Sequence, residues 1–276
     1  MMRAAYREID GALAFHEDIG QGRTVFCIHT AGQSGVQWRH AGAALARRGY
    51  RVIVPDLPGH GRSEPPTTGA ISDLRDYARW CERLMDELEL EQPYVVGCSI
   101  GGKIAIELAC SMGARLAGAV AMAADAGMPK AAGQAMRRGL LRELEDCAAP
   151  SRSDRTYFGT LAVVGRNVAQ ARRQLIADMH RREDPIVSNS DLIGWASFDA
   201  WSRLESARCP VHLVAGDDDL WIDAQAVRRT AQAMPRARYT LLEGIGHYPM
   251  EEMENFDAVL DGWLQDLRAT PNEVQA

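Results

Sequence analysis

"VVGCSIGGKIAIELA" (residues 95–109) runs an apolar strand pattern directly into an apolar helix pattern, with Ser99 at the junction. Gly97 and Gly101 flank Ser99 at positions where a side chain would collide with a sharply bent backbone. A helix that begins just after the serine points its positive dipole end and free N–H groups toward it, which lowers the cost of a developing anion. The stretch indicates either an ordinary strand-to-helix turn or a nucleophile on a sharp turn, and the rest of the sequence has to distinguish them.

The composition is that of an ordinary globular protein, with 46% hydrophobic and 25% charged residues among 276. That length suits one large domain, or one domain with an insertion. A net charge of −6 does not indicate a nucleic-acid partner. The apolar runs are too short to span a bilayer, and the N-terminal segment lacks the apolar core of a signal peptide. We therefore expect no nucleic-acid or membrane partner and a cytoplasmic location.

The six cysteines are scattered, without a C-x-x-C pair or a Cys/His cluster. Several lie in apolar runs, where cysteine behaves as a small hydrophobic residue. The sequence therefore predicts reduced thiols and no metal site.

Short β-rich runs alternate with longer helical runs along the chain. The expected strands are residues 24–30, 51–56, 94–99, 118–125, 211–217 and 237–244. The expected helices are residues 37–48, 72–90, 101–112, 223–234 and 254–268. This alternation predicts an α/β fold, a mostly parallel sheet with helices on both faces. Two further short strands joined by Asp10-Gly11 predict an antiparallel hairpin at its start.

Residues 127–200 break the alternation, since they contain no strand-like run. Residues 129–147, 155–165 and 167–184 have helical patterns, and Asp184-Pro185 and Gly194 punctuate the later part. This segment is predicted to be a helical cap, or lid, inserted into a core made of residues 1–126 and 201–276.

A serine nucleophile needs a base and a group that orients the base. On such a sheet they are expected in the order serine, acid, histidine, each after a later strand. Three aspartates, residues 217–219, follow the strand "VHLVAG", and His247 lies in a glycine-rich loop after the last strand. Because parallel strands build their sites at their carboxyl ends, Ser99, one of these aspartates and His247 are expected to meet.

The segments around these residues resemble the α/β-hydrolase superfamily. Ser99 lies in G-C-S-I-G-G, "GDDD" follows the penultimate strand and "GHYPMEE" follows the last. "VIVPDLPGHGRSEPP" (residues 52–66) and "CIHTAGQSGVQW" (residues 27–38) match the family's segments after its fourth and third strands. The resemblance covers nearly the whole chain outside the cap. It is strongest to small capped esterases, enol-lactonases and C–C bond hydrolases of aromatic degradation.

The resemblance implies a Ser-His-Asp triad with Ser99 as nucleophile, His247 as base and Asp219 as its orienter. Asp219 is the fourth residue of the family's G-[DE]-x-D pattern. A rival acid is Asp125, which follows the run "AMAA", because some relatives carry their acid there. Asp125 could instead cap a helix or lie at a hinge to the cap.

The oxyanion hole needs two N–H donors. The resemblance implies the backbone N–H groups of Ile100 and Ala31. Thr30 stands where the family pattern has glycine, so this loop departs from the pattern. Thr30, Trp38 and Trp221 are predicted to contact substrate.

The predicted reaction is hydrolysis of a carboxylic ester or lactone through a Ser99 acyl-enzyme. The triad supplies base and nucleophile, so no metal or organic cofactor is expected. The expected partner is a small-molecule ester, lactone or ketone, and a homodimer is left open. Three alternatives stay open: C–C bond hydrolysis of a β-diketone or ring-cleavage product, perhydrolysis or lyase chemistry, and a ligand receptor on the same fold.

Overall fold

The computed structural model describes residues 2–145 and 152–268, and their strands form one eight-stranded sheet in the order β1-β2-β4-β3-β5-β6-β7-β8. The strands are β1 (Met2–Ile9), β2 (Ala12–Gly20), β3 (Arg23–Ile28), β4 (Tyr50–Pro55), β5 (Tyr94–Cys98), β6 (Gly118–Met122), β7 (Val211–Gly216) and β8 (Ala237–Leu242). From β4 to β8 across the sheet, neighbouring strands are parallel. The predicted parallel sheet is therefore confirmed.

The predicted hairpin is also confirmed. β1 pairs antiparallel with β2, and β2 pairs antiparallel with β4. Asp10 and Gly11 make the turn with φ values of 55° and 76°. A two-residue turn of this kind matches the twist of the strands it joins, and glycine adopts positive φ at little cost.

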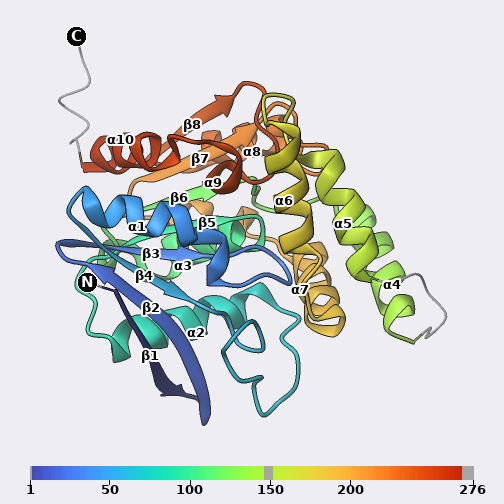
Figure 1. The fold of residues 1–276 in the computed structure, drawn as a ribbon, viewed down its shortest axis with the longest axis horizontal. Helices are drawn as coiled ribbons and strands as arrows, with labels where there is room; N and C mark the ends of the chain where they lie inside the picture. The colour runs from blue at the N-terminus through green and yellow to red at the C-terminus, as the bar shows by residue number, and fades with distance from the viewer. Residues whose placement is uncertain (1, 146–151, 269–276) are drawn as a thin grey trace.

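Helices cover both faces of the sheet (Figure 1). Those of the expected core are α1 (Arg39–Arg47), α2 (Leu74–Glu87), α3 (Ile100–Met112), α8 (Ala224–Ala233), α9 (Pro249–Glu252) and α10 (Phe256–Arg268). α1 packs on α10, and α2 packs on α3. No helix of the described residues is long and apolar enough to cross a membrane.

Four helices connect β6 to β7 and lie side by side at one end of the molecule (Figure 1). They are α4 (Lys130–Glu145), α5 (Arg152–Val163), α6 (Gln170–His180) and α7 (Pro185–Ser197). We call residues 127–200 the cap segment; its division from the core as a separate domain stays a prediction. Residues 146 and 147 of the first predicted helix lie outside the described residues.

The sequence prediction marked Asp184-Pro185 and Gly194 as punctuation and named no helix between residues 184 and 200, whereas α7 begins at Pro185 and contains Gly194. The Asp184 carboxylate accepts hydrogen bonds from the N–H groups of Ile186 (2.8 Å) and Val187 (3.1 Å), so it caps the helix. Pro185 stands at the first helical position, where its missing N–H costs nothing. A Cβ at Gly194 would lie 3.1 Å from the Leu74 side chain, so this glycine lets α7 approach α2 closely.

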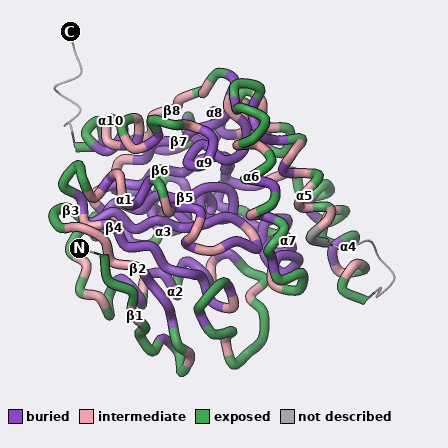
Figure 2. Tube along the Cα trace, viewed as in Figure 1, coloured by how far each residue is buried: buried purple, intermediate pink, exposed green. Residues whose placement is uncertain are grey.

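Figure 2 shows that the central strands and α3 are buried, whereas β1 is mostly exposed. Every residue of β5 and β6 is buried. The carboxyl ends of these strands are therefore fixed by the core, which makes them a rigid base for the loops that follow.

Candidate active site

Ser99 lies on a sharp turn between β5 and α3, with φ 58° and ψ −120°. This backbone conformation is strained for a residue other than glycine. Its N–H is held by the carbonyl of Met122, at 2.9 Å. A Cβ at Gly97 would overlap the Gly101 carbonyl, and one at Gly101 would lie 2.6 Å from the carbonyl oxygen of Ile28. The two flanking glycines are therefore required by close backbone approach.

His247 and Asp219 form a hydrogen-bonded pair, with 2.7 Å between His247 Nδ1 and Asp219 Oδ2. Both side chains are nearly inaccessible to solvent. The other Asp219 oxygen accepts from the N–H groups of Trp221 (2.9 Å) and Ile222 (3.2 Å), which fixes the carboxylate. Because an ionised carboxylate only accepts, the hydrogen bond to Asp219 favours the tautomer of the neutral imidazole that carries its proton on Nδ1, in which Nε2 is an acceptor.

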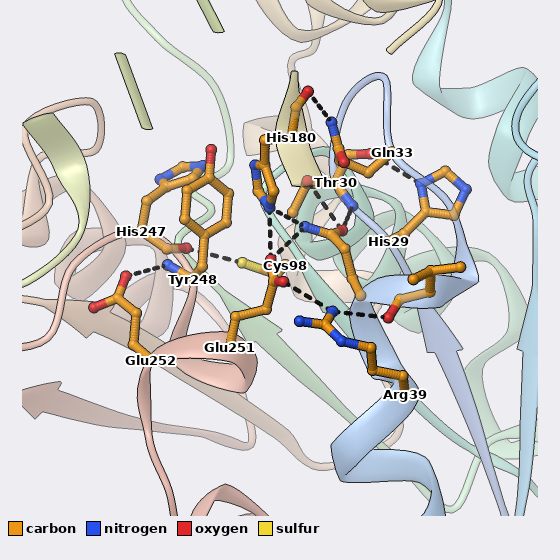
Figure 3. Close-up of polar contacts among 12 residues, drawn as sticks. His29, Thr30, Gln33, Arg39, Cys98, His180, His247, Tyr248, Glu251 and Glu252 are labelled. Carbon is orange, nitrogen blue, oxygen red and sulfur yellow. Dashed lines mark hydrogen bonds and ion pairs between the residues drawn. The ribbon is translucent and has the colours of Figure 1, made fainter. Parts of the chain in front are cut away.

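The loop that carries His247 is braced by Glu252 of α9. The Glu252 carboxylate accepts from the N–H groups of Gly246 (2.6 Å) and Tyr248 (2.9 Å), on either side of the histidine. Figure 3 shows the hydrogen bond to Tyr248. The His247 N–H donates to the Val163 carbonyl of the cap segment, at 3.1 Å. Burial raises the pKa of Glu252, and its hydrogen bonds to backbone N–H groups offset part of that rise. The imidazole is therefore held by contacts from both the core and the cap segment.

Ser99 and His247 line one cavity of about 520 Å³ between the sheet and the cap segment. Its core lining is Thr30, Ala31, Ser99, Leu220, Trp221, Ile222, His247 and Tyr248. Its cap lining is Met128, Met136, Leu140, Arg155, Thr156, Gly159, His180, Glu183, Ser188, Leu192 and Trp195. The Trp221 ring lies 4.9 Å from the His247 ring, centroid to centroid. The cavity thus has an apolar part, rich in Met, Leu and Trp, and a polar part.

The loop after β3 leaves one N–H group unengaged at this cavity. The Thr30 N–H donates to Gln37 Oε1 (2.8 Å), and the Gly32 N–H donates to Asp191 Oδ2 (2.8 Å). Between them, the Ala31 N–H has no hydrogen-bond partner within residues 2–145 and 152–268. Ala31 and Ser99 line the same cavity, and an unengaged N–H there can donate to a developing oxyanion.

Ile100 begins α3 directly after Ser99 and is fully buried. The first N–H groups of a helix have no partner within the helix. The Ile100 N–H is therefore the second candidate donor.

One predicted role needs correction, and one alternative is not supported by the geometry. Trp38 does not line the cavity; it is buried in the core, with its ring 6.2 Å from that of Phe256. The turn at residues 35–38 directs it toward α10, because a large apolar ring is more stable in the core. Asp125 is not the partner of His247: its carboxylate lies 2.6 Å from the buried ammonium of Lys103.

A buried polar network beneath the loop was missed by the sequence analysis (Figure 3). Gln37 Nε2 donates to Glu251 Oε2 (3.1 Å), and His180 Nε2 lies 2.6 Å from the same oxygen. Arg39 pairs with the other oxygen of Glu251, at 3.2 Å. Burial raises the pKa of Glu251, but its interactions with His180, Arg39 and Gln37 together outweigh burial, so the net shift is downward. These residues come from three distant segments, and no short motif connects them.

The described residues contain no cluster of three or more His, Cys, Asp or Glu side chains that could hold a metal ion.

A family model described as alpha/beta hydrolase fold matches residues 23–253. The chain belongs to this family. The match spans the strand-to-helix turn at Ser99, the pair of Asp219 with His247, and the cap segment. The family explains the mostly parallel sheet and the position of the cavity at its carboxyl edge.

Two curated relatives differ in activity. A 2-hydroxy-6-oxononadienedioate/2-hydroxy-6-oxononatrienedioate hydrolase of Paraburkholderia phymatum is 26% identical over 263 residues, which cover 90% of each chain. A non-heme chloroperoxidase of Kitasatospora aureofaciens is 29% identical over 253 residues, covering 86% of this chain and 90% of the relative.

Among solved structures, a thermophilic esterase from Thermogutta terrifontis matches with a TM-score of 0.81 and 22% identity, covering 97% of this chain and 100% of the esterase. At this identity the likeness concerns the fold alone.

Proposed function

We propose that this protein is a serine hydrolase that cleaves a carboxylic ester or lactone through a Ser99 acyl-enzyme. The observation that carries the proposal is the sharing of one cavity by a serine on a strained turn, a carboxylate-oriented histidine and an unengaged backbone N–H at Ala31. These are the parts that acyl transfer needs, namely a nucleophile, a base and an oxyanion donor.

In the proposed first half-reaction, Ser99 Oγ attacks the carbonyl carbon while His247 Nε2 accepts the hydroxyl proton. Asp219 stabilises the imidazolium that forms, through the hydrogen bond to Nδ1. The N–H groups of Ile100 and Ala31 donate to the tetrahedral oxyanion, each worth about 2.7–4 kcal/mol of barrier in comparable sites. His247 then returns its proton to the leaving alkoxide, which gives an acyl-Ser99; the alcohol of an ester departs, whereas that of a lactone stays attached to the acyl group.

In the second half-reaction, water takes the place of the alcohol. His247 removes a proton from the water as its oxygen attacks the acyl carbon, and then protonates Ser99 as the carboxylic acid leaves. The steps need no metal or organic cofactor.

The test is hydrolysis of p-nitrophenyl esters of graded acyl length, and of simple lactones, by wild type and by Ser99→Ala. We expect turnover by wild type and none above background by the variant, with the preferred acyl length reporting the size of the cavity. A fluorophosphonate probe should label Ser99 in wild type only. Full ester hydrolysis by Ser99→Ala would refute the acyl-enzyme.

C–C bond hydrolysis is the second candidate, because the relative from Paraburkholderia phymatum carries that activity in its name at 26% identity. The same serine, histidine and oxyanion donors can serve a vinylogous ketone. Ring-cleavage dienones, offered beside the esters, discriminate the two: cleavage of the dienone with little ester turnover would favour this candidate. Because another relative is named a chloroperoxidase, the same assays are also run with added hydrogen peroxide, to test for perhydrolysis.

A further inference from the structure

The loop at residues 30–33 is held from both sides of Ala31 by buried acceptors. Gln37 Oε1 accepts from the Thr30 N–H, and Asp191 Oδ2 accepts from the Gly32 N–H, each at 2.8 Å. The two peptide groups on either side of the Ala31 N–H are therefore fixed, and the direction of that N–H follows from theirs.

Asp191 belongs to α7 of the cap segment and is fully buried. Besides the Gly32 N–H, it accepts from the Tyr77 hydroxyl of α2 at 2.7 Å and lies 2.8 Å from His60 Nε2. A buried carboxylate is costly unless its oxygens are hydrogen-bonded, and these three groups satisfy them. One cap residue thus connects the loop after β3, the loop after β4 and helix α2.

The surroundings of His60 favour its pairing with Asp191. Its Nδ1 faces the Pro58 carbonyl at 3.1 Å and its Nε2 faces Asp191, so both ring nitrogens meet acceptors. Burial lowers the pKa of His60, but Asp191, the Pro58 carbonyl and Asp56 together outweigh it, and the net shift is upward. These surroundings favour the protonated ring, which in that form stabilises the buried Asp191 carboxylate 2.8 Å away.

The loop at residues 30–33 also packs closely against the cap segment. Gly32 has φ 67°, and a Cβ there would lie 2.6 Å from Glu183 Oε2 and 2.8 Å from Ser188 Cβ. Gln33 Nε2 donates to the His180 carbonyl of α6 at 3.1 Å (Figure 3). The conformation of this loop is therefore set by cap residues as well as by the sheet.

We propose that Asp191 is a positioning residue for the reaction: from the cap segment it holds the Gly32 N–H and thereby aims the Ala31 N–H at the oxyanion. The inference rests on the proposed function, in which Ala31 stabilises the tetrahedral intermediate. It gives the cap segment a part in the chemical step in addition to enclosing the substrate. An interaction made only in the transition state affects kcat and leaves KM nearly unchanged.

The experiment compares Asp191→Ala and Asp191→Asn with wild type, using kcat and KM for a short p-nitrophenyl ester. We expect Asp191→Ala to lower kcat by about 10- to 100-fold, less than loss of an oxyanion donor itself, with KM nearly unchanged. Asp191→Asn should recover most of kcat, because its amide oxygen can still accept from the Gly32 N–H. A boronic acid that mimics the tetrahedral intermediate should bind Asp191→Ala more weakly in proportion to the loss of kcat.

Glu107→Gln is the matched control, since Glu107 is another buried carboxylate, paired with Arg203 away from the cavity. It should lower the melting temperature without changing kcat. Asp191→Ser, whose small side chain leaves room for a water, replaces the alanine variant if that one does not fold.

Two failures are distinguishable. If a fluorophosphonate probe does not label Ser99 in wild type, the proposed function fails, and this inference fails with it. If wild type is labelled and turns over ester, but Asp191→Ala retains full kcat and boronate affinity, the inference alone is overturned.

Discussion

At the scale of the residue, the distances to neighbouring atoms explain why particular positions are glycine or aspartate. Gly97 faces the Gly101 carbonyl so closely that a Cβ would overlap it, whereas a Cβ at Gly262 of α10 would meet nothing within 4 Å. Asp219 makes three hydrogen bonds, and one of them fixes the tautomer of His247. Each position yields a prediction.

Gly97→Ala should prevent folding or lower the melting temperature strongly, because the backbone of the turn cannot move away. Gly262→Ala should raise the free energy of unfolding by about 0.5–1 kcal/mol, since alanine is the better helix residue. Thermal melts followed by circular dichroism compare both variants with wild type. Equal melting temperatures for Gly97→Ala and wild type would mean that the turn is not packed in this way.

Asp219→Asn should lower kcat by about 10⁴-fold, as the same change does in serine proteases by favouring the wrong imidazole tautomer. Asp218→Asn, next in the chain and paired with Arg166, should leave kcat unchanged. Ester hydrolysis at saturating substrate measures both. An active Asp219→Asn would assign the orienting role to another group.

At the scale of the element, helix α7 connects the cap segment to the loop at residues 30–33. Its N-terminus depends on Asp184, whose carboxylate accepts two of the first N–H groups. Asp184→Ala should lower the free energy of unfolding by about 1 kcal/mol, and Asp184→Ser should recover most of it, because serine also caps helices. Urea unfolding of the three proteins is the measurement. An alanine variant as stable as wild type would show that the Asp184 carboxylate does not stabilise the N-terminus of α7.

At the scale of the whole molecule, buried histidines make stability depend on pH. Burial lowers the pKa of His212 from 6.5 to about 4, because a charged imidazole loses its hydration beneath Trp263. The unfolded chain therefore binds a proton between these pH values that the folded chain does not. The stability that depends on a neutral His212 is fully present above about pH 6.5 and is lost as the pH falls toward 4. His29, with a pKa also lowered to about 4 by burial, acts in the same direction, and His60 acts in the opposite one.

Wild type should lose stability as the pH falls from about 7 to about 5, and His212→Gln should lose less over the same range. Glutamine can keep a hydrogen bond to Thr240, which His212 Nε2 contacts at 2.8 Å, without taking up a proton. Urea unfolding at several pH values gives the two slopes. Parallel slopes would mean that His212 is not kept neutral by the fold.

The sequence by itself determined the features that depend on neighbouring residues. Alternation of strand and helix patterns predicted the sheet, Asp10-Gly11 predicted the hairpin, and the order of Ser99, the aspartates and His247 along the chain predicted which loops would meet. These signals are local, because propensity, turn chemistry and glycine spacing act over a few residues. The helix begun by Asp184-Pro185 was within reach of the same reasoning, as a cap followed by proline.

Only the tertiary structure decided what lies around those residues. Asp191 binds a loop 159 residues away, and Glu251 contacts Gln37 across 214 residues. In the same way, Trp38 is buried in the core, and the Asp125 carboxylate pairs with the Lys103 ammonium. Such pairings depend on which distant surfaces pack together and which buried charges must be satisfied, and one sequence carries no local pattern for either.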